Sequence, residues 1–348
     1  MRTGLVAATV AVSGAAASAV DAPQPLCSTT DPQVAELSGL VVDGPADGPA
    51  RLRIIVDGGG TGEVVTVDPV SCAPLEVRDT GIAVTDVEDL GLAPDGTLWL
   101  ADTGDNRGER DTVRLVEVPS TGPARAHDLR YADGPRDAEA VLVADDGVPL
   151  IVEKRTGAAG VFRPDRPLDG GPGPVVLERV AEVVLPYSAT GGGPLGRGGT
   201  RTVTGGAVSP ADAPDGRAAA LRTYTDAWLF PLPAGRVTGD DLVAALQTSP
   251  LPVPLPDEAQ GEALALDRGG TLLSGTEARG TAPAGIRTAA GAVAAATAPD
   301  APVVAPPAQA PPVRTFPDWL PAAAGAGVVG VLLVAGVGAM ALHGRRRR

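Results

Sequence analysis

Short hydrophobic runs alternate with clusters of glycine, proline and aspartate along most of the chain. Residues 88–101 show the pattern: an apolar run after Glu88 leads to a Pro-Asp-Gly turn at 94–96 and then to a second run at 97–101. Runs of this length, rich in valine and threonine and bounded by turn residues, are typical of β-strands and too short for most helices. We therefore expect an all-β body with many short strands.

An acidic residue followed by an apolar run recurs at a regular spacing. Glu36, Glu88, Glu139 and Glu262 each open such a frame, and Gly206 occupies the corresponding place in another frame. Successive frames begin 52, 51, 67 and 56 residues apart. Each frame leads through a turn rich in aspartate and glycine to a second expected strand, and these strands cover residues 51–56, 97–101, 148–152, 218–221 and 271–273.

This repeat predicts a β-propeller. A period of about 50 residues with several strands per unit is typical of propeller blades, each of which is a four-stranded sheet beside a central channel. Five units are visible, and the long third step leaves room for a sixth blade or for the glycine-rich insertion 191–199. A β-sandwich would explain the alternating strands equally well, but not the same acid in the same place four times.

The repeat places the acids on one rim of the channel. If the strand after each acid is the innermost strand of its blade, the second strand runs back and ends at the same rim. The four acids that open the frames are then candidate metal ligands: Glu36, Glu88, Glu139 and Glu262. Carboxylates that converge on a channel repel one another, and a hard cation with oxygen ligands offsets this repulsion. Calcium is the expected ion outside a cell.

The same rim supplies candidate ligand-binding residues. The loop 102–107, Asp-Thr-Gly-Asp-Asn-Arg, hangs from it, and the ends of two other second strands add basic and aromatic groups. The predicted ligand-binding set is Asp102, Asp105, Asn106, Arg107, Lys154, Arg222 and Tyr224. Two alternatives stay open: the basic residues pair directly with the acids, or the acids cap strand ends and bond backbone N–H groups. The glycine at position 206 also interrupts a complete ring of carboxylates.

Composition and charge exclude some classes of function. The formal net charge of −14 argues against a nucleic-acid partner, because binding to phosphates needs a basic face. The chain has no G-x-S-x-G motif and no P-loop, and its two histidines, His127 and His343, form no Cys/His cluster for zinc. Whether the protein is an enzyme stays open. Hydrolysis would have to be metal-assisted, with carboxylates holding the ion.

The N-terminal region indicates export. Residues 1–19 are predicted to be a signal peptide, because an apolar run after Arg2 ends in Ala-Ser-Ala at 17–19. The two cysteines, Cys27 and Cys72, then lie in an oxidising compartment, where an even count predicts one disulfide bond. Lipidation of Cys27 is the alternative, but the Gln-Pro-Leu sequence before it lacks the small residues of a lipobox.

The C-terminal region indicates a membrane anchor. Residues 320–342 carry no charge and are long enough for one transmembrane helix, and the arginine-rich tail 343–348 is expected in the cytoplasm. The segment 281–318 is rich in proline and alanine and is expected to be an extended spacer. The propeller ectodomain should therefore cover 27–280 and lie outside the cell, held at the cell membrane by a single span.

Several stretches of the body together resemble a known group of proteins. They are DVEDLGLAPDGTLWLADTGDNRGERDTVRLVEVP, DGPRDAEAVLV with the VEK that follows it, ALRTYTDAWLF and QGEALAL. In these stretches, over roughly residues 37–276, the chain resembles the exported β-propeller proteins of actinobacteria, which are grouped with phytase-like and esterase-like propellers. The resemblance implies a propeller fold and an extracytoplasmic location, and it implies little about a substrate.

These observations favour a surface protein that binds something. We predict a membrane-anchored propeller that binds an unidentified surface ligand or a cell-wall component through its carboxylate-rich rim. The alternative is a divalent-metal-assisted hydrolase, a phosphoesterase or an esterase-like enzyme, at the same rim. The catalytic version needs a buried ion with an open coordination position, whereas the binding version tolerates a fully paired rim.

Overall fold

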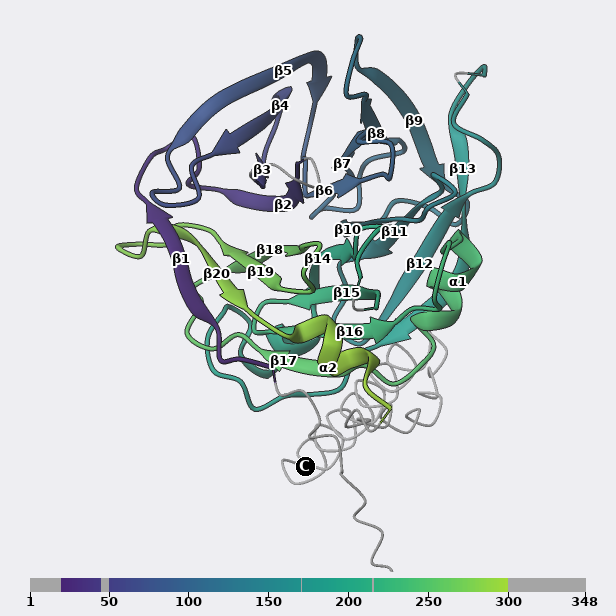
Figure 1. Cartoon of the computed structure of the whole chain (residues 1–348). Helices are drawn as coiled ribbons and strands as arrows, with labels where there is room; N and C mark the ends of the chain where they lie inside the picture. The colour runs from purple at the N-terminus through teal and green to yellow at the C-terminus, as the bar shows by residue number, and fades with distance from the viewer. Residues whose placement is uncertain (1–19, 45–49, 170, 215, 300–348) are drawn as a thin grey trace, which may run out of the picture. The chain divides into compact units, whose positions relative to one another are not determined.

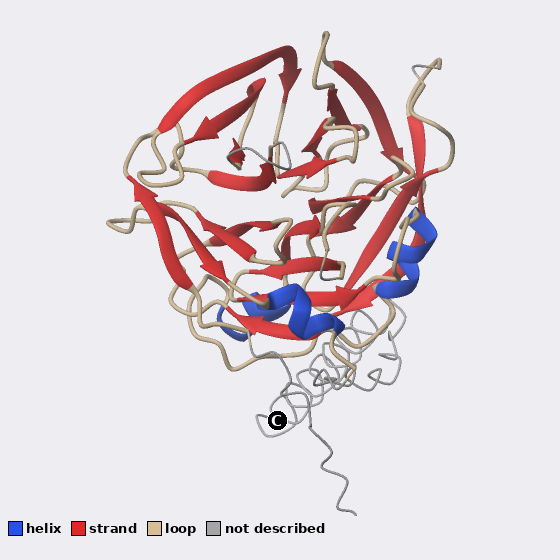
Figure 2. Cartoon of the chain, in the orientation of Figure 1, coloured by secondary structure: helices blue, strands red, loops and turns tan. Residues whose placement is uncertain are grey.

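The computed structural model describes residues 20–44, 50–169, 171–214 and 216–299, which lie in the first of the chain's two units, Met1–Pro306. β-Strands are the main secondary structure of these residues, which also form two short α-helices and one 3-10 helix (Figure 2). The prediction of an all-β fold is confirmed. Within the described ranges, no helix has the length and apolarity that a membrane span requires.

The strands are arranged as antiparallel meanders of four strands, and four of these meanders are continuous in sequence (Figure 1). A parallel pairing between the outer strands of the second and third meanders joins these two into one eight-stranded sheet. The first meander consists of β2 (Leu37–Asp43), β3 (Arg51–Val56), β4 (Gly60–Val67) and β5 (Pro74–Val84). The second consists of β6 (Asp89–Leu92), β7 (Leu98–Asp102), β8 (Val113–Val118) and β9 (Arg125–Tyr131). The third meander consists of β10 (Ala138–Val143), β11 (Pro149–Glu153), β12 (Ala158–Pro164) and β13 (Val175–Val184). The fourth consists of β14 (Val203–Val208), β15 (Ala218–Thr223), β16 (Asp226–Pro231) and β17 (Leu251–Pro254).

A further meander brings together strands from both ends of the described body. β18 (Gly261–Leu266), β19 (Leu272–Thr276) and β20 (Ala284–Ala289) are completed by β1 (Gln24–Thr29), which pairs antiparallel with β20. The first strands of the meanders, β2, β6, β10, β14 and β18, each contact the next around a common centre (Figure 1). This arrangement is a β-propeller, and β1 completes it by pairing with the edge of β20.

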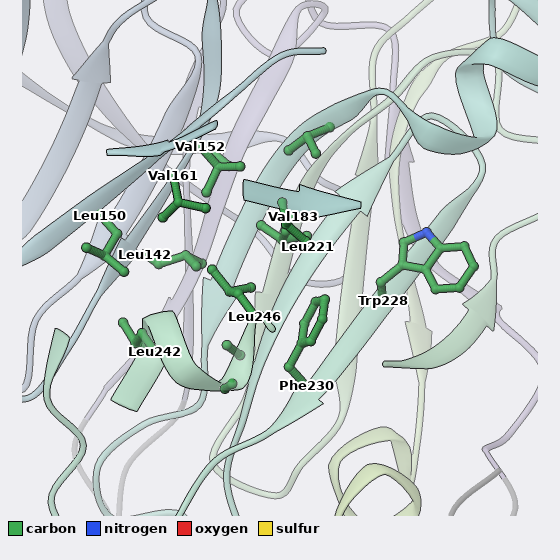
Figure 3. Packing of buried hydrophobic residues seen from close by; sticks show 14 of the residues in the cluster. Leu142, Leu150, Val152, Val161, Val183, Leu221, Trp228, Phe230, Leu242 and Leu246 are labelled. Atoms are coloured by element: carbon green, nitrogen blue, oxygen red, sulfur yellow. The ribbon is translucent and has the colours of Figure 1, made fainter. Parts of the chain in front are cut away.

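The hydrophobic residues pack between neighbouring meanders. Figure 3 shows the contact of the third meander with the fourth, where Leu142 and Val152 face Leu221 and Phe230. α1 (Gly239–Ala245) covers this cluster with Leu242, and a capping box at Thr238 and Asp241 starts that helix. Because inner strands such as β10 are buried on both faces, they read as continuous apolar runs, whereas the outer strand β9 alternates between buried and exposed residues.

The segment expected to begin the spacer contributes two elements to the propeller. β20 is hydrogen-bonded on both sides, and α2 (Ala292–Thr297) buries alanine and Val293 against β16 and β17. Small apolar residues suit a short buried helix as well as a linker, so composition alone does not separate the two. The predicted signal peptide 1–19, the spacer beyond residue 299, the transmembrane helix 320–342 and the tail 343–348 lie outside the described residues.

The long third step of the repeat contains an insertion between β13 and β14. Residues 185–202 form a loop that ends in a 3-10 helix, Gly196–Arg201. The loop passes Tyr224 closely, since a Cβ added at Gly193 would lie 2.8 Å from Tyr224 Cβ. The extra length therefore builds a wall beside the end of β15.

The register of the inner strands shifts the frame that the sequence indicated. Leu37 pairs with Val56 and Gly39 with Ile55, so Ser38 is the extra residue of a β-bulge. The same bulge recurs in three other inner strands, at Glu139, Thr204 and Glu262, and Glu88 holds the equivalent place just before β6. Ser38 and Thr204, rather than Glu36 and Gly206, are therefore the structural counterparts of the three glutamates.

The carboxylate of Asp89 fills the centre between the inner strands. It is fully buried and accepts hydrogen bonds from the backbone N–H groups of Leu90 (2.8 Å), Val141 (2.8 Å) and Gly206 (3.1 Å). Burial raises its pKa well above the ordinary value, against the three hydrogen bonds. Asp89 thus ties β6 to β10 and β14. A Cβ at position 206 would lie 2.8 Å from Leu142 Cδ2, so a larger residue there would displace the packed Leu142 side chain.

The predicted disulfide is present: Cys27 on β1 is bonded to Cys72 in the turn after β4. It joins the closing strand to the first meander across 45 residues. In the chain-entropy model a loop of this size contributes about 4 kcal/mol. We expect the Cys27→Ser, Cys72→Ser double variant to lose unfolding free energy of this order, measured by urea unfolding. Wild type in reductant should show the same loss. Equal midpoints for variant and oxidised wild type would contradict this expectation.

Candidate functional site

Carboxylates gather where the inner strands begin and the second strands end. Ala138 at the start of β10 pairs with Glu153 at the end of β11, and Gly261 pairs with Thr276 in the last meander. Residues just outside these pairs therefore share one rim, as the sequence predicted. We call this region the acidic mouth and define it by Asp57, Asp86, Glu88, Asp137, Glu139, Glu262, Glu277, Lys154 and Tyr224.

Glu88 lies at the centre of the acidic mouth. Its carboxylate belongs to two groups of three acids, one with Asp57 and Asp86 and one with Asp137 and Glu139. In each group, ligand atoms from the three residues lie within 4.8 Å of one another. Gly104 passes directly over it, since a Cβ on Gly104 would collide with carboxylate oxygens of Glu88 and Asp86. A side chain at position 104 would therefore displace these two carboxylates.

Burial raises the pKa values of these acids. Glu88 and Glu139 are 4% and 2% exposed, and burial, then a neighbouring carboxylate, raises the pKa of each well above its ordinary value. Burial followed by Asp86 raises the pKa of Asp57 to about 6. Burial also raises the pKa of Glu262 to about 8 and that of Glu277 to about 7. Without an ion, these acids therefore keep protons at pH values where an exposed carboxyl group would be ionised.

Lys154 is the cation of the acidic mouth. Its ammonium forms an ion pair with Glu139 Oε1 and lies 5.9 Å from the centre of the Tyr224 ring. Burial alone would lower its pKa, but Glu139, Tyr224 and Glu262 raise it above the ordinary value. Lys154 therefore stays charged, and it neutralises one of several carboxylates.

Three carboxylate oxygens in the mouth are buried and have no hydrogen-bond partner among the described residues. They are Asp57 Oδ1, Glu139 Oε2 and Glu262 Oε2. A buried, unpaired carboxylate oxygen is costly unless a proton or a cation meets it. The donor set contains only carboxylates near Glu88, which suits a hard divalent cation such as calcium.

The polar loop 102–107 is held by hydrogen bonds and an ion pair between its aspartates and neighbouring residues. Asp102 Oδ1 accepts from the backbone N–H of Asp86 (2.9 Å) and pairs with Arg110 (2.9 Å). The Asp105 carboxylate accepts from the N–H groups of Glu109 and Arg110, both at 2.9 Å. These two aspartates shape the loop that carries Gly104 over the mouth. Asn106 and Arg107 are exposed at its tip.

The other predicted site residues fall in different places. Lys154 and Tyr224 lie in the acidic mouth with Glu88, Glu139 and Glu262. Glu36 is exposed at its edge, where its charge contributes to the raised pKa values of Asp57 and Glu277. Arg222 is fully buried between meanders and pairs with Glu258 and Ser274, so it does not face the mouth.

Two ligand candidates, Asp86 and Asp137, were missed from the sequence although a signal was present. Each stands two residues before a mouth glutamate, as Asp86-Val-Glu88 and Asp137-Ala-Glu139. Each aspartate offers a ligand atom within 4.8 Å of one from the glutamate two residues later, so the repeated Asp-x-Glu marks places where two carboxylates share one space. Glu36 occupies the same place relative to Ser38, which explains its position at the edge.

A cavity of about 930 Å³ opens at the opposite rim, beyond Asp89. Its charged residues are largely paired: Arg53 with Asp43 at 2.9 Å and Arg217 with Asp145 at 2.6 Å. Apolar ends of the inner strands form much of its floor. Among the described residues, three of the four buried carboxylate oxygens without a partner lie at the acidic mouth. The fourth, Asp43 Oδ1, lines this cavity, but the other oxygen of Asp43 is paired with Arg53. The candidate chemistry therefore belongs at the mouth.

Comparisons with known proteins show distant likenesses. No protein-family model and no curated protein matches this chain. Among solved structures, it is similar to a gluconolactonase from Xanthomonas campestris, with 12% identity over 78% of this chain and 97% of that one and a TM-score of 0.38. It is also similar to a glutaminyl cyclase from Myxococcus xanthus, with 14% identity over 78% of this chain and 96% of that one and a TM-score of 0.38. For a virginiamycin B lyase from Staphylococcus aureus the identity is 12% over 72% of this chain and 66% of that one, with a TM-score of 0.34. Values this low say nothing of activity.

Proposed function

We propose that this protein is a surface-binding propeller whose acidic mouth holds a divalent cation, and that the cation attaches an oxygen-rich ligand. Glu88, Asp137 and Glu139 would hold the ion, since their ligand atoms lie within 4.8 Å of one another. The observation that carries the proposal is Glu139 Oε2, which is buried and has no hydrogen-bond partner among the described residues. When bound, a calcium ion supplies open coordination positions for carboxylate, phosphate or hydroxyl oxygens.

The groups beside the ion would orient the ligand. Lys154 keeps its charge and lies over the Tyr224 ring, so an anionic oxygen on the ligand would meet the ammonium while a second oxygen reaches the ion. The insertion 185–202 walls this side of the mouth and limits the size of what enters. A polymer of the cell surface with sugar hydroxyl and phosphate or carboxylate groups has this chemistry.

Thermal unfolding tests the cation. We expect wild type to melt at a higher temperature in calcium than in chelator, because an ion that binds only the folded state stabilises it, by about 4 kcal/mol at a thousand times Kd. Glu88→Gln keeps the shape of the side chain and should abolish the difference. Arg107→Ala, at the exposed loop tip, is the matched control and should keep it. Identical melting of wild type in both solutions would refute the proposal.

Metal-assisted hydrolysis at the same mouth is the second candidate. It is favoured by Glu277 and Glu262, whose pKa values of about 7 and 8 suit a group that takes up and releases a proton near neutrality. Assays with chromogenic phosphate and carboxylate esters, with and without calcium, separate the candidates. Turnover that Glu277→Gln abolishes without loss of ion binding would favour hydrolysis, and binding without turnover would favour the first proposal.

We also propose a setting for the propeller. Its five described meanders would be the complete set of blades, since β1 closes the last one onto the first. Export and a single C-terminal span are supported by the disulfide Cys27–Cys72 and by the uncharged segment 320–342. Recovery of the mature protein in the membrane fraction, accessible to protease from outside, would test this setting.

A further inference from the structure

We propose that the acidic mouth binds two divalent cations, with the Glu88 carboxylate bridging them. This inference rests on the proposed function and deepens it from one ion to a pair. One ion would lie among Asp57, Asp86 and Glu88, and the other among Glu88, Asp137 and Glu139.

The geometry of the carboxylates carries the first step. In each of the two groups, ligand atoms from all three residues lie within 4.8 Å of one another, and Glu88 belongs to both. A carboxylate has two oxygens and so can contact two ions at once. Paired ions in proteins lie about 3.5–4 Å apart, a separation that one bridging carboxylate spans.

Unpaired atoms support an ion in each group independently. Glu88 is only 4% exposed, yet its carboxylate makes no hydrogen bond or ion pair with the described residues. The outer ligands show the same feature on both sides, since Glu139 Oε2 and Asp57 Oδ1 are buried without partners. A buried acid that is left unpaired in this way is destabilising unless something positive fills the space.

The charges favour two ions over one. The two groups contain five carboxylates, and Lys154 is the cation that pairs with them, through Glu139. Within the described part of the chain, no basic side chain pairs with Asp57, Asp86 or Glu88, so this side has no cation of its own. Two divalent ions with Lys154 balance five carboxylates, whereas one ion leaves a net negative charge buried.

A bridged pair would select a particular ligand. Two ions side by side present adjacent open positions, which match two oxygens on one phosphorus or carbon centre. Phosphate monoesters, phosphodiesters and carboxylates have such paired oxygens. The two-ion mouth would therefore prefer them to neutral sugars.

The number of bound calcium ions decides the question. We expect isothermal titration and native mass spectrometry of the folded wild type to give two ions per chain. Asp86→Asn and Asp137→Asn should each reduce the number to one, and Glu88→Gln should weaken both sites by tenfold or more. Asp240→Asn, on the exposed side of α1, is the matched control and should keep two.

The outcomes separate this inference from the proposed function. One ion in wild type, lost in Asp137→Asn but kept in Asp86→Asn, would overturn the pair and leave the single-ion proposal intact. No ion in wild type would overturn both. The wild-type count needs no variant, so it decides the matter even if Asp86→Asn or Asp137→Asn fails to fold.

Discussion

The Glu258→Ala variant should lose about 3–5 kcal/mol of unfolding free energy, because it leaves the Arg222 guanidinium buried without its counter-ion. Arg222 is 0% exposed, pairs with Glu258 and donates a hydrogen bond to Ser274. Glu258 also accepts a hydrogen bond from Ser274 (2.7 Å), so one substitution breaks a connected network between the last two meanders. Gly261 makes the room for this network, since a Cβ there would collide with the guanidinium.

A charge-free version of the same site is the control. The double variant Arg222→Met, Glu258→Leu removes both ions together and should be much closer to wild type, since well-packed apolar residues can replace a buried ion pair at little cost. Equilibrium unfolding in urea gives the free energies of wild type, single variant and double variant. A loss below about 1 kcal/mol in Glu258→Ala would show that water reaches Arg222 and that the pair is not truly buried.

Much of the architecture could be predicted from the sequence because the repeat is a physical unit. Each meander needs an inner strand, a tight turn and a returning strand, and this need produced the spacing of about 50 residues between Glu88 and Glu139. The bulge could not be predicted, because it adds a residue without changing the apolar pattern. For that reason the frame read from the sequence contains Glu36 and Gly206, whereas the structural counterparts of the glutamates are Ser38 and Thr204.

The ends of the fold show another limit. β1 and β20 are neighbours in one sheet, yet most of the chain lies between them, and no local pattern marks such a pairing. The alanine-rich stretch that forms α2 was expected to be spacer. Its burial depends on the apolar surface of β16 and β17, which a reading of residues 292–297 alone does not contain.

The meeting of these residues on one rim was predicted in outline, because strand ends that share a rim bring their flanking residues together. Lys154 and the three glutamates Glu88, Glu139 and Glu262 follow from that rule. Arg222 does not, because a returning strand in a propeller is packed on both faces and its residues turn toward neighbouring blades. A lone arginine within the fully buried run Ala218–Thr223 is itself a sign of an internal ion pair.

The stability of the ion-free protein should fall as pH rises from about 5 to 8. Asp57, Glu277 and Glu262 have folded-state pKa values of about 6, 7 and 8, each raised above its ordinary value of 3.8 or 4.5. Over this range the folded state still binds protons that the unfolded state has released, so each step up in pH favours unfolding. The contribution is complete below about pH 4 and is lost as the pH passes each raised pKa.

Melting temperatures in chelator at pH 5, 6, 7 and 8 measure how stability falls with pH. The Glu262→Gln variant should lose less stability than wild type over this range, because its amide cannot ionise. The difference should be largest between pH 7 and 8. Calcium should reverse the trend, since ions compete with protons for the same oxygens and win as the acids ionise. The gap between calcium and chelator should therefore widen toward pH 8. A melting temperature in chelator that stays level or rises over this range would mean that the mouth acids are already ionised and solvated at pH 5, which would remove the physical need for a cation there.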